Sequence, residues 1–516
     1  MHYLNTNAQI RLFQDTLNSE IYVDKSMLIK KISSMIRTNE KYVCITRPRR
    51  FGKTVNANML GAYYTKGYDS HELFKRLEIA GTRDFESHIN KYNVIHIDFS
   101  VVPDFCDEYR TYLKSIIRKL QEDLLEAYPG LKGKEYAGVN EMLQASGDSF
   151  IFILDEWDSV FHEKYVTDED KMHFLKFLKG LLKDKSYVDL TYMTGVLPIA
   201  KYSSGSELNM FWEYNFMNDR TFEEQFGLTE DEVKELCEKH KSVSYKELEW
   251  WYDGYLIGDG RHLFNPRSVN RALVDGRCQN YWTETGPMNE VADCIEHNVD
   301  EVRADIVKMV SGISVEADLS GYSAVEQEMN TRDEILSAMA VYGFLLYHDG
   351  YVRIPNHELM EKYQGVLSRD SMGEIKQIVD SSKEMLSATL ASDEQRVAEI
   401  LEKVHDREIP FLEYNDENAL SCVITLCYLY ARKDYWIERE AKSGKGYCDF
   451  LFIPKRKGKA VIILELKVDD CAENAIDQIK QKDYVQRAEA YDEILLVGIS
   501  YKKKEKKHYC IIEKYR

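Results

Sequence analysis

Four short apolar runs, separated by stretches of helical spacing, organise the first 205 residues. They occupy 42–45, 94–99, 150–154 and 188–193. Each run has the length of a buried strand, and the apolar residues of 55–64 and 108–128 recur with helical periodicity. Strands that alternate with helices predict a parallel sheet of the α/β class, in which ligands bind at the carboxyl ends of the strands.

Residues 206–400 have a mainly helical pattern. Thr229 and Glu232 have capping-box spacing at the start of one helix. Asp349-Gly350 separates two apolar segments and predicts a short hairpin. A hairpin after helices fits a winged-helix subdomain and fits an ornament on a lid equally well, and the pattern does not choose between them.

After residue 410 the pattern changes again. A helix opened by 415–417 precedes three predicted strands at 435–438, 447–453 and 460–467. We therefore predict three parts: a phosphate-loop domain at 1–205, a helical lid or middle region at 206–400, and a second α/β domain at 410–516.

Composition narrows the class of protein without deciding the partner. The chain has 516 residues and a net charge of −19, which disfavours a nucleic-acid partner on average. Residues 411–516, however, hold 20 Lys and Arg against 18 Asp and Glu. Basic runs at 455–459 and 502–507 are most often solvated loops and less often phosphate-binding patches. The charge leaves the question open.

The location can be predicted from cysteines and apolar stretches. The ten cysteines contain no CxxC pair, which is typical of reduced thiols. No apolar stretch approaches the roughly 18 residues of a membrane helix, and the N-terminus lacks a signal-peptide core. We expect a cytoplasmic protein with no membrane partner.

A phosphate-binding loop is predicted between the first strand and the first helix of the sheet. Lys53 would reach the β- and γ-phosphates, and the Thr54 hydroxyl would bind Mg²⁺. Arg47 stands where the usual pattern has its first glycine, and Pro48 removes one backbone donor. We expect this loop, together with Asp155, to bind the nucleotide through Arg47, Pro48, Arg49, Arg50, Phe51, Gly52, Lys53 and Thr54.

Two later strands end in residues suited to nucleotide hydrolysis. Asp155 would hold Mg²⁺ through water, and Glu156 would activate the attacking water. Thr194 is the candidate for contact with the γ-phosphate or the lytic water. The plainer interpretations are a solvated acidic turn and a threonine that merely ends a strand. Arg271, Arg303 or another arginine of the middle region could supply an arginine finger, but the sequence does not identify which.

A second set of polar residues lies on the predicted strands after 410. Glu465 and Lys467 are two residues apart, so they share one face of an otherwise apolar strand. With Asp449 on the preceding strand, Glu465 could hold one or two divalent ions, and Lys467 could stabilise developing negative charge. Glu417 is a candidate additional ligand, and Gln478 and Lys482 could face the same cleft. An internal salt bridge is the plainer interpretation.

These residues resemble a bacterial and archaeal family that pairs an AAA-ATPase-like domain with a C-terminal PD-(D/E)XK nuclease-like domain. The resemblance covers nearly the whole chain. It rests on the residues at 22–25, 47–54, 154–156, 194–196, 251–255, 265–266, 354–356, 449, 465–467 and 478–479. In that family an arginine commonly replaces the first loop glycine, so the resemblance makes Arg47 a family trait.

The resemblance implies ATP binding and hydrolysis, coupled to a nuclease-like domain that uses Mg²⁺ or Mn²⁺. Our first hypothesis is an ATP-regulated nuclease acting on DNA. The alternative is a nucleotide-switched signalling or assembly module whose C-terminal domain binds nucleic acid or protein without cleavage. A ring-forming ATPase motor has less support. A second copy of the chain or another protein is a further expected partner.

Overall fold

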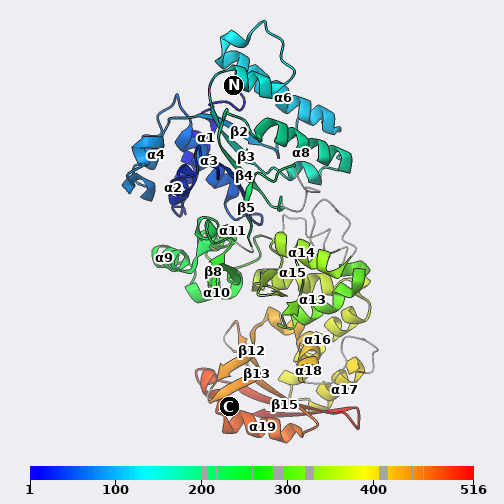
Figure 1. Ribbon diagram of the computed structural model, residues 1–516. Helices are drawn as coiled ribbons and strands as arrows, with labels where there is room; N and C mark the ends of the chain where they lie inside the picture. Colours follow the sequence, from blue (N-terminus) through cyan, green and yellow to red (C-terminus); the bar gives the residue numbers. More distant parts are fainter. Residues whose placement is uncertain are drawn as a thin grey trace. The chain divides into compact units, whose positions relative to one another are not determined.

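The computed structural model describes residues 1–199, 207–216, 219–257, 260–282, 292, 295–319, 331–405, 417–443, 445–456 and 458–516 (Figure 1). The fold divides into two compact units. The first comprises Met1–Pro287 and Ala317–Glu358, and the second comprises Met288–Glu316 and Leu359–Arg516. The predicted middle region, 206–400, is thus shared between the two units. The boundaries of the three predicted domains stay a prediction.

The first unit is built on a five-stranded parallel sheet in the order β2-β3-β4-β1-β5. The four apolar runs form four of these strands, so the predicted parallel α/β sheet is confirmed, and β5 is an addition. The strands are β1 (Tyr42–Thr46), β2 (Asn93–Asp98), β3 (Phe150–Asp155), β4 (Val188–Gly195) and β5 (Trp212–Tyr214).

Helices cover both faces of this sheet. Figure 1 shows α1 and α3 on one side of it and α6 and α8 on the other. The helices of the core are α1 (Ala8–Leu17), α2 (Met27–Ser33), α3 (Lys53–Tyr64), α4 (His71–Phe74), α5 (Phe85–His88), α6 (Tyr109–Ala127), α7 (Val139–Ala145) and α8 (Asp168–Leu182). Burial on both faces explains why these strands are continuous apolar runs without polar alternation.

The strand order decides which polar residues meet. β4 lies between β1 and β3, and its register places Thr194 beside Ile45 of β1. On its other side, Met193 is paired with Leu154, the residue before Asp155. Because parallel strands end at the same edge, the phosphate loop after β1, Asp155 and Thr194 come together at one edge of the sheet.

A smaller helical part of the first unit follows the sheet. It contains α9 (Glu230–His240), α10 (Tyr245–Tyr252), α11 (Pro266–Asp275) and α14 (Arg332–Val341), with a small sheet of β6 (Leu228–Thr229), β8 (Arg261–Phe264) and β7 (Tyr255–Ile257). The capping box of Thr229 and Glu232 is present at α9. The Asp349-Gly350 hairpin is also confirmed, between β10 (Leu346–His348) and β11 (Tyr351–Arg353).

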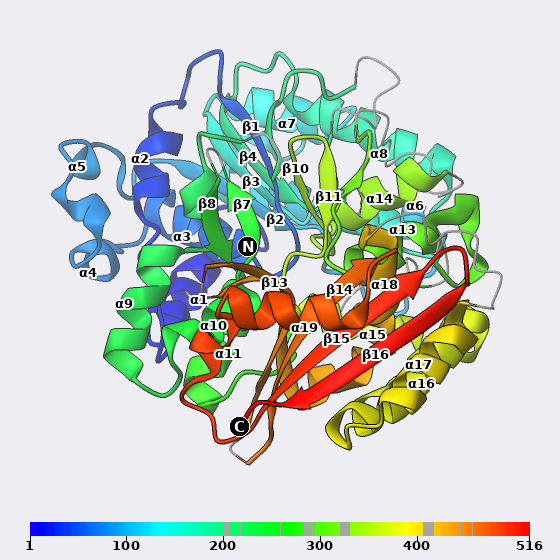
Figure 2. The ribbon, with the colours of Figure 1, turned by 90° about the horizontal axis from the view of Figure 1, so that it is seen from below.

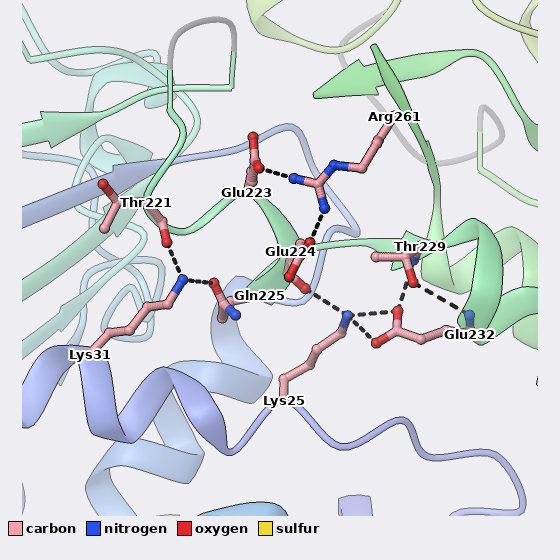
Figure 3. Close-up of polar contacts among 9 residues, drawn as sticks. All are labelled: Lys25, Lys31, Thr221, Glu223, Glu224, Gln225, Thr229, Glu232 and Arg261. Atoms are coloured by element: carbon pink, nitrogen blue, oxygen red, sulfur yellow. Dashed lines mark hydrogen bonds and ion pairs between the residues drawn. The ribbon is translucent and has the colours of Figure 1, made fainter. Parts of the chain in front are cut away.

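Ion pairs connect the chain before α2 to the segment that leads into α9 (Figure 3). The Lys25 ammonium donates to both carboxylate oxygens of Glu232, at 2.6 and 2.7 Å, and to the Glu224 carbonyl at 2.7 Å. Arg261 of β8 donates to the Glu223 and Glu224 carboxylates. Lys25 is largely buried, so these partners compensate for the loss of its hydration.

The second unit contains a mixed five-stranded sheet in the order β12-β13-β14-β15-β16. Only β14 and β15 are parallel; the other neighbours are antiparallel. The strands are β12 (Tyr435–Ser443), β13 (Gly446–Pro454), β14 (Val461–Val468), β15 (Ile494–Lys502) and β16 (Lys507–Lys514), and the unit also contains β9 (Val315–Glu316). The predicted C-terminal α/β domain is thereby confirmed.

Helices of the second unit cover its sheet and extend its core. Figure 2 shows α19 lying across β14 and β15. The helices are α13 (Val302–Val310), most of α15 (His357–Leu367), α16 (Glu374–Leu390), α17 (Glu394–His405), α18 (Glu417–Cys427) and α19 (Ala472–Gln481). Across both units, no described helix combines the length and the apolar character needed to cross a membrane.

Candidate functional site

The phosphate loop presents one set of side chains to a cavity and another to the protein interior. Arg49, Arg50, Gly52, Lys53 and Thr54 line a cavity of about 720 Å³. Arg47, Pro48 and Phe51 are buried on the opposite side of the loop. Gly52 has a left-handed φ of 90°, and a Cβ there would meet no atom within 4 Å, so backbone conformation rather than space favours glycine.

Arg47 does not reach the cavity, in contrast to its expected role in nucleotide binding. Its guanidinium forms an ion pair with Asp219 and donates to the Tyr214 carbonyl at 2.8 Å. It also lies 5.1 Å from the centre of the Phe226 ring. A buried guanidinium requires such partners, because its hydration is lost. The side chain of Arg47 therefore anchors the loop to the segment after β5.

Pro48 and Phe51 also anchor the loop and do not line the cavity. A Cβ at Gly343 would lie 2.7 Å from Cβ of Pro48, so only glycine allows this close packing. The Phe51 ring packs edge-on against Tyr255, with ring centres 5.3 Å apart. Of the eight loop residues expected at the nucleotide, five line the cavity and three fix the loop in place.

Lys53 is held above the loop by two carbonyl groups. Its ammonium donates to the carbonyls of Arg47 and Pro48 at 3.1 and 3.2 Å. The cavity wall carries further cations from α11, Arg267 and Arg271. Burial, and then the Arg267 and Arg49 guanidiniums, lower the pKa of Arg50. Cations crowded this closely repel one another, and an anion in the cavity would relieve the repulsion.

Only one of the two named candidates for an arginine finger lies at the nucleotide cavity. Arg271 lines the cavity, whereas Arg303 lies in the other compact unit and donates to the carbonyls of Ile295 and Glu296. Arg267 and Asn270, which sequence reasoning missed, line the same wall. Asn265 before Pro266 is a cap signal that could have marked the start of α11, but the position of this helix beside the loop depends on tertiary packing.

Asp155 lies fully buried beside the cavity, at the end of β3. The Thr194 hydroxyl donates to its Oδ1, while Oδ2 is buried with no hydrogen-bond partner among the described residues. Burial raises the pKa of Asp155 to about 6, and hydrogen bonds from Thr194 and Thr54 oppose the rise. Thr194 therefore orients Asp155 and does not itself face the cavity, in contrast to its expected contact with the nucleotide.

Glu156 and Asp158 follow Asp155 along the cavity wall but differ in role. Glu156 lines the cavity from a left-handed backbone conformation, φ 51°, that few non-glycine residues adopt. Oδ2 of Asp158 accepts the backbone amides of Val196 and Leu197 at 3.0 and 2.7 Å. Glu156 is thus placed to meet a ligand, and Asp158 fixes the turn after β4.

The second set of predicted residues meets around one buried carboxylate, Glu465. Its Oε2 accepts the Asp449 amide at 3.4 Å, and its Oε1 lies 3.5 Å from the Lys467 ammonium. Gln478 of α19 donates to the same Oε1. Asp449 in turn accepts the Leu466 amide at 2.7 Å.

Strand periodicity explains this arrangement. Val461 and Ile463 belong to the apolar core that α19 covers, and Glu465 follows them on the same face of β14. Gln478, one helical turn from Lys482, is delivered by α19 to that face. Lys482 is exposed and adjoins Gly446 rather than the carboxylates. Glu417 begins α18, but its side chain lies outside the described part of the chain.

Electrostatics distinguish this site from an ordinary salt bridge. Burial, and then the adjacent Asp449 carboxylate, raise the pKa of Glu465 to about 7, while Lys467 opposes the rise. Two carboxylates that disfavour each other's charge form a suitable pair for a divalent cation. Among the described residues, no group of three or more His, Cys, Asp or Glu side chains is arranged to hold a metal ion.

Comparison with known proteins finds two family models that match the chain. Residues 10–204 match the family described as a predicted AAA-ATPase, and residues 415–510 match the PD-(D/E)XK nuclease superfamily. Among curated proteins, none matches the chain.

Two solved structures show distant similarity. The ORC2 protein of Aeropyrum pernix, in ADPNP–ADP complexes, is 13% identical with a TM-score of 0.33, over 69% of this chain and 97% of that chain. A Walker-type ATPase of Pyrococcus abyssi is 11% identical with a TM-score of 0.33, over 66% and 94% of the two chains. The chain thus carries an AAA-ATPase-like domain at residues 10–204 and a domain of the PD-(D/E)XK nuclease superfamily at residues 415–510.

Proposed function

We propose that this protein hydrolyses ATP and that its nucleotide state regulates a metal-dependent nuclease site acting on DNA. One observation carries the proposal: both predicted sets of polar residues, dispersed in sequence, assemble around a buried carboxylate. Thr194 and Thr54 surround Asp155, and Lys467, Gln478 and Asp449 surround Glu465. Such buried groups are costly unless a ligand compensates them.

In the first site, the cavity residues divide into binding and positioning groups. Gly52, Lys53 and the start of α3 would bind the β- and γ-phosphates, with Arg49, Arg50, Arg267 and Arg271 neutralising charge. Glu156 would orient and deprotonate the attacking water. Thr194 holds Asp155 in one orientation, so Oδ2 remains directed to its ligand.

Thr54 and Asp155 fit a hydrated Mg²⁺. The fit rests on the buried Oδ2 of Asp155, which has no hydrogen-bond partner among the described residues, and on Thr54, an exposed residue that lines the cavity. Bound Mg²⁺ would neutralise phosphate charge. The cation would also remove the cost of keeping Asp155 ionised in a buried position.

In the second site, Asp449 and Glu465 would hold Mg²⁺ or Mn²⁺, which supplies Lewis-acid stabilisation to a phosphodiester. Lys467 would stabilise charge that develops on the scissile phosphate, and Gln478 would orient Glu465. The fit to a cation rests on the raised pKa of Glu465 beside Asp449. Glu417 remains a proposed further ligand.

The proposed substrate is DNA, and the proposed location is the cytoplasm. A phosphodiester is the substrate class that a carboxylate pair with an adjacent lysine suits best. The nine described cysteines are all free thiols, which supports a reducing compartment. Nucleotide binding at the loop would change the conformation of its own unit and thereby shift the population competent for cleavage.

Incubation of the full chain with plasmid and single-stranded DNA tests the proposal. Each substrate is incubated with Mg²⁺ or Mn²⁺, and with ATP, ADP or no nucleotide. Asp449→Ala should abolish cleavage and retain ATP hydrolysis, whereas Lys53→Ala should lose ATP hydrolysis and the response of cleavage to ATP. Asp477→Ala and Lys30→Ala replace exposed residues outside both sites and serve as matched controls.

The outcomes separate the proposal from a non-cleaving switch. Absence of cleavage in every condition, with ATP hydrolysis intact, would favour the nucleotide-switched module. Cleavage by Asp449→Ala at the wild-type rate would refute the assignment of Asp449 and Glu465 as metal ligands. Cleavage that is identical with ATP, ADP or no nucleotide would refute regulation while leaving the nuclease assignment in place.

A further inference from the structure

A second cavity, of about 520 Å³, lies within the second unit, and none of the residues around Glu465 line it. It is formed by α15, α16 and the 3-10 helix Leu429–Lys433 that precedes β12. Its volume falls in the range of ligand-binding cavities, roughly 300–1,000 Å³. Neither the nucleotide site nor the nuclease-like site uses any residue of this cavity.

Three cations of the cavity wall lack a carboxylate partner. Lys383, Arg432 and Lys433 form no ion pair among the described residues, although the chain as a whole is strongly acidic. The cavity also contains Glu361 and Asp380, and Asp380 pairs instead with Lys376 at 2.7 Å. In an acidic protein, unpaired cations gathered in one concave region mark a place for an anion.

Buried donors distinguish this cavity from a group of surface lysines. Nε of Arg432 and Nε2 of Gln364 are both excluded from solvent, and neither has a hydrogen-bond partner among the described residues. Burial alone lowers the pKa of Arg432 to about 10, with no acidic group opposing the change. Buried donors without acceptors are costly, so an acceptor-rich ligand would stabilise both.

Tyr430 lies beside both lysines of the cavity wall. The Lys433 and Lys383 ammoniums lie 4.8 and 5.9 Å from the centre of its ring. The amide of Tyr430 donates to Ser382 of α16 at 3.1 Å, which fixes the 3-10 helix against that helix.

We propose that this cavity binds a phosphate group, through the Arg432 guanidinium with Lys383, Lys433 and Gln364. An arginine fork matches the oxygens of a phosphate, and flanking ammoniums add charge without requiring a fixed geometry. The phosphate could belong to a free ligand or to a nucleic-acid backbone, and these two sources share the same recognition chemistry. The proposal does not depend on nuclease activity.

The test uses the full chain in a Lys53→Ala background, so that the phosphate loop does not contribute. One arm measures inorganic pyrophosphate by calorimetry. The other measures fluorescein-labelled 20-nucleotide single-stranded and duplex DNA by anisotropy, in EDTA to prevent cleavage. The Lys383→Glu/Lys433→Glu double variant should weaken binding at least about 10-fold in one arm, and Lys403→Glu, also exposed but outside the cavity, by less than about 2-fold.

The arms identify the source of the phosphate. If the double variant loses affinity only for DNA, the cavity binds a nucleic-acid backbone. The salt dependence of DNA binding should then fall by the amount expected for about one to two phosphate contacts. A loss for pyrophosphate assigns the cavity to a free phosphorylated ligand. Since both lysines are exposed, their replacement should not prevent folding; Arg432→Lys should retain more affinity than Arg432→Met. Equal binding by the double variant and its parent in both arms, or an equal loss with Lys403→Glu, overturns the proposal.

Discussion

Nη2 of Arg47 donates a hydrogen bond to Oδ2 of Asp219, and this ion pair is buried beneath the phosphate loop. Asp219 also accepts the backbone amides of Thr221 and Phe222. The pair thus joins the loop after β1 to the segment that leads from β5 toward α9. The arginine at the first-glycine position has a structural role in this protein.

Replacing either member of this pair should destabilise the fold. Arg47→Met leaves the Asp219 carboxylate buried without its cation, at a cost of about 3–5 kcal/mol in the free energy of unfolding. Urea unfolding measures this cost. Arg49→Met, which alters a cavity-lining arginine, should change the free energy of unfolding by less than about 1 kcal/mol but weaken ATP binding. Equal midpoints for Arg47→Met and the wild type would contradict the structural role.

Thr194 and Thr191 on β4 provide a matched pair of buried hydroxyls. Thr194 donates to Asp155, whereas Oγ1 of Thr191 has no hydrogen-bond partner among the described residues. Thr194→Val should lower the ATP turnover rate by about 10- to 100-fold, because Asp155 loses its orienting donor. Thr191→Val should retain turnover and be neutral or slightly stabilising. Steady-state phosphate release and thermal unfolding measure the two effects; similar turnover in both variants would exclude the orienting role.

Gln478 should act on the nuclease-like site through Glu465. Gln478→Ala removes a donor to Oε1, which disfavours the ionised form and raises the pKa of Glu465 further above about 7. The rate of DNA cleavage at pH 7 should fall about 10-fold and recover toward pH 9, which a purely structural loss would not produce. Gln481→Ala, exposed at the end of the same helix, is the control. A uniform loss across the pH range would argue against positioning.

His96 should make the protein sensitive to acid. Burial lowers its pKa to about 4, and Nε2 has no hydrogen-bond partner among the described residues. Between pH 6.5 and 4 the unfolded chain therefore binds a proton that the folded chain does not. The free energy of unfolding should fall by about 3 kcal/mol as pH decreases through this window.

Urea unfolding of His96→Leu between pH 7 and 4 measures this dependence. The variant should lose the His96 contribution to the slope of stability against pH. His348→Leu, which replaces an exposed histidine of the β10–β11 hairpin, should keep that slope. Parallel curves for His96→Leu and the wild type would show that another group is responsible.

Much of the fold could be predicted because local signals agreed with it. The apolar runs became β1 to β4, the helix expected at 108–128 is α6, and Asp349-Gly350 forms its hairpin. β5 was missed because three residues, Trp212 to Tyr214, are too few to show a period. The sequence did not show that each compact unit is built from two separate stretches of the chain, because apolar periodicity does not record which distant segments pack together.

The sequence predicted which residues belong to each candidate site, but not which way each side chain points. Loop spacing identified Lys53 and Thr54, and strand alternation placed Glu465 and Lys467 on one face. Spacing could not show that Arg47 turns inward, because the requirement for Asp219 arises only when the two are buried together. It also could not select Arg271 over Arg303.

The sequence by itself determined the elements, their order and the residue types available for phosphate and metal chemistry, because periodicity and turn chemistry act within a few residues. Tertiary structure decided which of those residues meet. The insertion of β4 between β1 and β3 brings Thr194 to Asp155, and the packing of α19 on β14 brings Gln478 to Glu465. Burial at these junctions then sets the charge that each carboxylate can carry, since removal from water favours its neutral form.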